Sequence, residues 1–283
     1  MNPKFGTAGA GDLFYAQGHK HSAEVPAFLA DLGLGAFEYQ CGRGVNIGPE
    51  KAALLGRNAA EHGIALSIHA PYFITLATDE EEKKKNNLRY FTDSANAARS
   101  MGASRIVFHP GMNGKLSKEE AFIRSKDALA AILDKLDALG FGDLIFCPET
   151  MGHPSQIGSL DDALSLCELR GNMLPCVDFG HMYARTSGAC DGKEAFAAIF
   201  EQIEQKLGSE RTGKIHCHFS RIEYNRGGEK KHLTFADTAF GPAFEPLIEL
   251  IAARGYSPTV ICESAGTQAQ DACAMSAYYN SIH

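Results

Sequence analysis

Histidines and carboxylates recur along this chain at the ends of short apolar segments. The segments LSIHA, RIVFHPG, LIFCPET, CVDFGH, KIHCHFS and TVICES carry His69, His109, Glu149, Asp178, His181, His216, His218 and Glu263. Imidazole and carboxylate groups without thiolates suit zinc, manganese or iron. A parallel barrel brings strand ends that are distant in sequence to one rim, where such barrels carry their chemistry. The repeated placement therefore predicts a multinuclear metal site.

The three carboxylates in this set require partners. Glu149, Asp178 and Glu263 each follow an apolar run, and a buried carboxylate without a partner is very costly. Three carboxylates at one rim would repel one another unless they were protonated or bound to metal. A salt bridge to a basic residue on a neighbouring strand is the alternative. Metal binding is the preferred interpretation because it neutralises all three, and the spacing of Asp178 and His181 allows both to face the same opening.

The histidines differ in how strongly they indicate a ligand. A single histidine in the position of His69 or His109 is often a satisfied core residue, but matching positions on successive strands favour ligation. His216 and His218 lie two residues apart and share one strand face. His218 is nearer the rim and is the better candidate, whereas His216 is expected one layer deeper. His232 is expected in a loop after the seventh strand. There, a solvent-exposed histidine that binds no metal is as good an interpretation as a ligand.

These residues need elements that bring them together. Apolar runs predict strands near residues 4–8, 36–40, 66–70, 105–109, 144–149, 173–179, 214–219 and 258–263. Helix-like stretches separate them, and one of these opens with a capping-box pattern from Ser117 to Glu120. Strands alternating with helices indicate a parallel α/β fold. Eight such units predict one (β/α)8 TIM barrel domain over residues 1–283, with an open doubly wound sheet as the alternative.

Composition narrows the class of protein. A net charge of −7 argues against a broad basic nucleic-acid surface, although a local basic groove is compatible with it. The start of the chain does not resemble a secretory leader, and no run approaches the roughly 18 apolar residues of a membrane span. Four of the eight cysteines, Cys147, Cys176, Cys217 and Cys262, lie in apolar strand-like runs and are expected to be buried. We therefore expect a cytoplasmic monomer without a membrane partner.

The order and context of these residues resemble the endonuclease IV family of apurinic/apyrimidinic (AP) endonucleases, within the xylose-isomerase-like TIM barrels. The resemblance runs from about residue 60 to about residue 265, and its most specific pieces are HAPYFITLAT, FHPG, PETMG, VDFGH and CESAG. It implies a (β/α)8 barrel, two to three zinc ions, and base-excision repair through incision of DNA on the 5′ side of an abasic site. Manganese or iron could replace zinc.

The resemblance also implies roles for single residues. Glu149 would bridge two metals and be the central catalytic carboxylate. His69 and His109 would complete one metal site, Asp178, His218 and Glu263 the other, and His181 and His232 would hold a third metal. Tyr72 and Phe73 resemble the pair that wedges the DNA open, and Arg43 is retained in a loop that contacts DNA in the family.

The sequence departs from the family pattern at the third metal. The family places an aspartate two residues before the last histidine, where this chain has Lys230. Glu229, one residue away, is the candidate replacement, and His216 is a further candidate ligand. A sugar isomerase or epimerase from the same barrels is the main alternative, because such enzymes bind one or two divalent metals through Glu, Asp and His at the rim. They use fewer histidines, so the histidine-rich rim favours phosphodiester hydrolysis. A metal-stabilised binding barrel without catalysis is the third.

Overall fold

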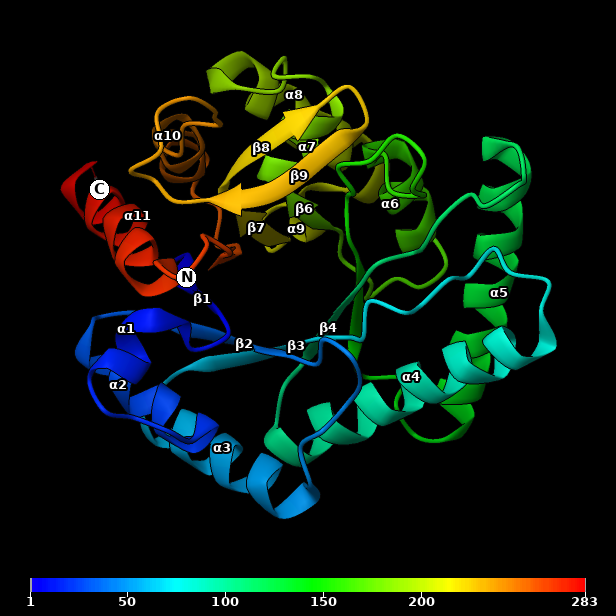
Figure 1. Ribbon diagram of the computed structural model, residues 1–283, viewed down its shortest axis with the longest axis horizontal. Helices are drawn as coiled ribbons and strands as arrows, with labels where there is room; N and C mark the ends of the chain where they lie inside the picture. Colours follow the sequence, from blue (N-terminus) through cyan, green and yellow to red (C-terminus); the bar gives the residue numbers. More distant parts are fainter. Residues whose placement is uncertain (1, 283) are drawn as a thin grey trace.

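The computed structural model describes residues 2–282, and these form a barrel of eight parallel strands surrounded by helices (Figure 1). The strand order is β5-β4-β3-β2-β1-β10-β7-β6. The strands are β1 (Lys4–Ala8), β2 (Ala36–Gln40), β3 (Ala65–His69), β4 (Arg105–Phe108), β5 (Ile145–Pro148), β6 (Cys176–Asp178), β7 (His216–Phe219) and β10 (Thr259–Cys262). An isolated parallel bridge between Glu149 and Cys176 joins the two end strands. The predicted single-domain (β/α)8 barrel is therefore confirmed.

The strands lie where the apolar runs predict them, within three residues at every end. Fully buried parallel strands read as continuous apolar segments because helices cover one face and the barrel interior covers the other. Cys147, Cys176, Cys217 and Cys262 are each 0% exposed, as predicted. Among residues 2–282, no helix has both the length and the apolar character needed to cross a membrane.

Helices connect the strands and form the outer layer. They are α1 (Gly11–Ala16), η1 (Ser22–Glu24), α2 (Val25–Asp31), α3 (Pro49–Glu61), α4 (Glu81–Met101), α5 (Lys118–Ala138), α6 (Leu160–Cys167), α8 (Gly192–Leu207), α9 (Ser209–Thr212), α10 (Glu245–Arg254) and α11 (Gln268–Ile282). The capping box at the start of α5 is confirmed: Glu120 N donates to Ser117 Oγ and Ser117 N donates to Glu120 Oε2. The first strand and the last helix lie side by side, because α11 packs against β1 (Figure 1).

Two elements at the rim differ from the prediction. The expected loop after the seventh strand is an antiparallel hairpin, β8 (Arg221–Asn225) and β9 (Gly228–Leu233), so His232 lies on a strand. After the sixth strand, where the sequence predicts no helix, the chain forms the short helix α7 (Phe179–Arg185), whose first turn carries His181. Asp178 caps this helix by accepting a hydrogen bond of 2.7 Å from His181 N. The hairpin packs against α7, which brings His181 and His232 together.

Candidate metal centre

A pocket of about 190 Å³ lies at the C-terminal ends of the barrel strands. Six of the predicted ligands line it: His69, His109, Glu149, His181, His232 and Glu263. The other two of the eight, Asp178 and His218, are fully buried beside them. Glu229 also lines this pocket, while His216 does not. The barrel thus gathers residues from six strand ends and from the hairpin.

Glu149 is at the centre of the cluster. Its Oε2 lies 3.1 Å from His69 Nε2 and 2.9 Å from His109 Nε2. Its Oε1 lies 3.2 Å from His218 Nδ1 and 3.3 Å from His181 Nδ1. Burial acts to raise the pKa of Glu149, but the positive charge of His109 and His218 holds it well below the usual range. One buried carboxylate therefore directs its two oxygens at two separate pairs of histidines.

A group of potential metal ligands lies beside Glu149 Oε1. Potential ligand atoms of Glu149, Asp178, His218 and Glu263 all lie within 4.8 Å of one another. Asp178 Oδ2 is fully buried and receives no hydrogen bond from any of residues 2–282. Burial raises the pKa of Asp178 to about 6. The nearest cationic group is the His181 ring, whose Nδ1 lies 3.3 Å from Asp178 Oδ2. One imidazole beside three carboxylates leaves an excess of negative charge, so the donor set fits a divalent metal.

The outward hydrogen bonds of the histidines also fit metal binding. His69 Nδ1 lies 2.9 Å from the carbonyl oxygen of Ala70, and His181 Nδ1 lies 2.9 Å from that of Thr150. With the Nδ1 proton donated to the backbone, Nε2 of each ring, which lies about 3.1 Å from a carboxylate oxygen, would be available to a metal ion. Tetrahedral zinc with bonds of about 2.0–2.1 Å places its ligand atoms roughly 3.3 Å apart. The spacing matches a set of metal ligands, and the backbone acceptors would fix the tautomer that metal binding through Nε2 requires.

A β-bulge determines which residue of the hairpin faces the site expected for the third metal, beside His181 and His232. In the ladder Glu223 pairs with Lys231 and Tyr224 pairs with Glu229, so Lys230 is the extra residue. Without the bulge Lys230 would share the face of His232. Instead Lys230 is paired with Glu223 on the outside, and Glu229 Oε2 lies 3.1 Å from His181 Nε2. The structure therefore places Glu229, and not Lys230, in the pocket.

Gly152 makes room for the Glu229 carboxylate. A Cβ atom on Gly152 would lie 2.1 Å from Glu229 Oε2, so no larger residue fits there without a shift. Gly152 N donates a hydrogen bond of 3.1 Å to the same oxygen. On β9, His232 Nδ1 lies 2.7 Å from Ser220 Oγ, and its ring lies 5.6 Å from that of His181. Glu229, His181 and His232 together could supply the three ligands that a protein zinc site usually requires.

This arrangement predicts a difference between two neighbouring substitutions. If Glu229 is a ligand, Glu229→Ala should lower the affinity of one metal by at least about 10–100-fold, the scale seen when a residue that only supports a ligand is removed. Lys230→Ala removes only an exposed side chain and should leave all metals bound. Metal content after dialysis against graded chelator, measured by mass spectrometry, separates these outcomes. Equal retention of every metal in both variants would contradict a ligand role for Glu229.

A buried layer below the pocket contains a residue that the sequence did not identify. Glu38 lies on β2 and is 0% exposed, and its Oε2 lies 2.9 Å from His216 Nε2. Burial acts to raise the pKa of Glu38, but the charge of His218 and the hydrogen bond from His216 hold it well below the usual range. A single acidic residue in the apolar run AFEY was the available signal, because the cost of a buried carboxylate applies to it as well. His216 lies in this deeper layer, as predicted.

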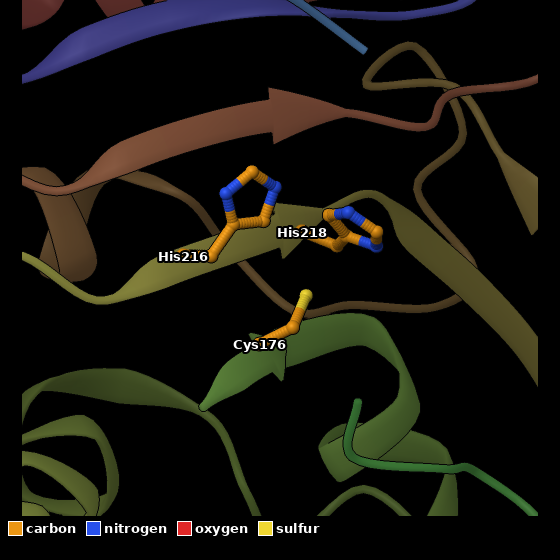
Figure 2. Close-up of side chains that lie close together, drawn as sticks. All are labelled: Cys176, His216 and His218. Atoms are coloured by element: carbon orange, nitrogen blue, oxygen red, sulfur yellow. The ribbon is translucent and has the colours of Figure 1, made fainter. Parts of the chain in front are cut away.

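Cys176 also lies close to these histidines (Figure 2). Its thiol on β6 points toward the strand that carries His216 and His218, and the three side chains could in principle hold an ion. However, Arg105 places a guanidinium nitrogen 3.4 Å from His216 Nδ1, and His216 Nε2 is directed at Glu38. A fixed cation beside the histidine opposes a second one, and both ring nitrogens are already engaged. We therefore interpret this group as part of the core.

The residues predicted to touch DNA lie at the edge of the pocket. Tyr72 and Phe73 are 46% and 47% exposed, and their ring centroids lie 4.6 Å apart. Tyr72 lines the pocket, and Arg43 Nε donates a hydrogen bond of 3.1 Å to its hydroxyl. Exposed neighbouring aromatic rings beside a polar pocket form a surface on which a planar group can stack.

Sequence comparisons find relatives of two kinds. An uncharacterized protein of Methanocaldococcus jannaschii, MJ0133, is 38% identical over 261 residues, which cover 92% of this chain and 91% of that protein. A probable endonuclease 4 of Thermoplasma acidophilum is 25% identical over 177 residues, 62% of this chain and 59% of that protein. The chain thus aligns with nearly the whole of the first relative and with a little over half of the second.

Solved structures share the fold. A D-tagatose 3-epimerase-like protein aligns with a TM-score of 0.74 at 18% identity, covering 99% of this chain and 97% of that one. Endonuclease IV from Thermus thermophilus aligns with a TM-score of 0.70 at 18% identity, covering 99% of this chain and 100% of that one. The sequence profile of the xylose isomerase-like TIM barrels matches residues 26–278. This protein is therefore a member of the xylose isomerase-like TIM barrel family.

Proposed function

We propose that this protein is a metal-dependent phosphodiester hydrolase of the endonuclease IV type, which incises duplex DNA on the 5′ side of abasic sites. One observation carries the proposal: Oε2 of buried Glu149 faces His69 and His109, while its Oε1 faces His218 beside two further carboxylates. That ligand set exceeds the needs of one ion. Clustered divalent metals stabilise charge on a transferring phosphoryl group and activate water, which is the chemistry that this hydrolysis requires.

The residues divide into three ligand groups. His69, His109 and Glu149 would hold one metal, and Glu149 would share a second with Asp178, His218 and Glu263. His181, Glu229 and His232 would hold the third. Zinc suits these ligands best, with manganese or iron as substitutes. Probable endonuclease 4 relatives support DNA as the substrate. Tyr72, Phe73 and Arg43 lie where they could stack on and steady the strand at the lesion.

A sugar isomerase or epimerase is the second candidate. The epimerase-like structures share the barrel, and the group of Glu149, Asp178, His218 and Glu263 alone would suffice for one metal. A pocket of about 190 Å³ also has room for a small molecule. This alternative assigns no role to His69, His109, His181, Glu229 or His232, which is why we favour hydrolysis. The two candidates predict different products from the same metal-loaded protein.

A substitution at the aromatic pair tests the DNA part of the proposal. Tyr72→Ala removes a ring that would stack at the lesion, and a lost stacking contact of ~1–3 kcal/mol should raise KM for an abasic duplex about ten-fold. Metal content should not change. Leu139→Ala is the matched control, because Leu139 is 59% exposed and follows α5 at the opposite end of the barrel. Wild-type KM in Tyr72→Ala, or an equal rise in the control, would count against DNA contact at Tyr72.

A further inference from the structure

Glu38 receives more polar contacts than a core carboxylate needs for a single ion pair. Ser67 Oγ donates to Oε2 at 2.9 Å and His216 Nε2 lies 2.9 Å from the same oxygen. Gln40 Nε2 donates to Oε1 at 3.1 Å, and His218 Nε2 lies 3.0 Å from it. Each carboxylate oxygen thus faces two potential donors, a pattern that fits an ionised acceptor.

The two histidines below the pocket are oriented through this carboxylate. Arg105 extends a guanidinium nitrogen to within 3.4 Å of His216 Nδ1 and donates a 2.9 Å hydrogen bond to the carbonyl oxygen of Lys214. A guanidinium can only donate, so His216 Nδ1 must accept and its proton lies on Nε2, which faces Glu38. Arg105, His216 and Glu38 therefore form a chain of fixed donors and acceptors that leads to His218.

His218 lies between the candidate metal centre and the buried layer of Glu38 and His216, with one ring nitrogen facing each. Its Nδ1 lies 3.2 Å from Glu149 Oε1 and 3.5 Å from Glu263 Oε2, within the candidate metal centre. Its Nε2 is buried and has no aligned hydrogen-bond partner among residues 2–282, although Glu38 Oε1 is within reach. A proton on Nε2 would leave the Nδ1 lone pair free for the cation.

From this geometry we infer that Glu38 is a positioning residue: it holds the proton of His218 on Nε2 and thereby directs the bare Nδ1 at the metal shared with Glu149. The inference rests on the proposed metal centre and adds a residue outside its ligand shell. A carboxylate behind a ligating histidine fixes the ring and its tautomer and makes the nitrogen that faces the metal more basic. Glu38 acts only through His218 and does not enter the pocket.

The first test uses the wild-type protein loaded with zinc. Long-range proton–nitrogen NMR correlations of the imidazole rings report which nitrogen carries the proton. We expect His218 to show a protonated Nε2 and a metal-bound Nδ1, identified by the loss of its signals in a His218→Gln spectrum. A proton on Nδ1, or metal on Nε2, would overturn the inference without any variant at Glu38.

The second test measures zinc affinity of Glu38→Gln by competition with a chromophoric chelator. The amide keeps the shape of the side chain but loses the charge and one acceptor oxygen, so we expect about a 10–100-fold loss of affinity at one site. Thr7→Val is the matched control, because Thr7 is also fully buried on a neighbouring strand and its hydroxyl has no hydrogen-bond partner among residues 2–282. It should bind zinc as the wild type does.

These outcomes separate the inference from the proposed function. Wild-type zinc affinity in Glu38→Gln, or an equal loss in Thr7→Val, would overturn the positioning role even if the protein incises DNA. Conversely, a protein with the expected tautomer and the expected loss in Glu38→Gln would retain this inference even if it leaves abasic DNA intact. If Glu38→Gln does not fold, the wild-type NMR measurement still decides the tautomer.

Discussion

Glu149→Gln is expected to abolish hydrolysis, with kcat reduced by more than about 10³-fold, on the scale of removing a central electrostatic group. The substitution keeps the shape of the side chain and removes the charge that faces four histidines. The amide also presents a donor to one histidine pair, so it cannot serve both. At least one of the two metals that Glu149 would share should therefore be lost, which elemental analysis measures alongside turnover.

The matched control for this variant is Glu82→Gln. Glu82 is exposed in the first turn of α4, so the same chemical change there should alter neither metal content nor turnover. A Glu149→Gln protein with full metal content and normal turnover would show that the bridging role is wrongly assigned. Loss of both metals with the fold intact would instead indicate that each pair of histidines depends on the shared carboxylate.

Removal of the metals should have the second large effect. After a chelator removes the metals, Glu149, Asp178 and Glu263 remain at one rim without cations to neutralise their charges. We therefore expect both activity and stability to fall. A metal present at 100 times its Kd contributes about 2.7 kcal/mol to folding. For a chain of this size, that corresponds to a Tm lower by roughly 5–10 °C in calorimetry, because about 1 kcal/mol shifts Tm by 2–4 °C.

Readdition of zinc provides the control for chelation. It should restore both Tm and turnover in the wild type, whereas magnesium, which prefers oxygen ligands, should restore less. An unchanged Tm together with full activity after exhaustive chelation would contradict a metal centre at this rim.

Much of the fold could be predicted because buried parallel strands leave a simple pattern. The run RIVFHPG predicts a strand at residues 105–109, and β4 covers Arg105–Phe108 with His109 directly after it. The same logic places His69, Glu149, Asp178, His218 and Glu263 at one rim from the sequence alone. Strand ends meet there because the strands are parallel and the sheet closes on itself.

The hairpin, the position of Glu229 and the role of Glu38 could not be predicted, because they depend on features that one sequence does not reveal. The segment IEYNRGGEKKHL is charged and short, so it resembles a loop although it forms the β8–β9 hairpin. Sequence spacing placed Lys230 at the third group, and only the bulge opposite Glu223 and Tyr224 turns it outward and brings Glu229 in. Glu38 was missed because its partners, His216 and Ser67, come from other strands far away in the sequence.

The most direct test of the central claim is a titration of metal-free protein with zinc, in which incision of an abasic-site duplex and bound zinc per chain are measured at each step. The proposed function predicts that 5′ incision begins only when more than one zinc is bound and reaches its plateau at two to three per chain. The same samples should leave ketose sugars unchanged. Full activity with one zinc per chain, or epimerised sugar in place of incised DNA, would contradict the account.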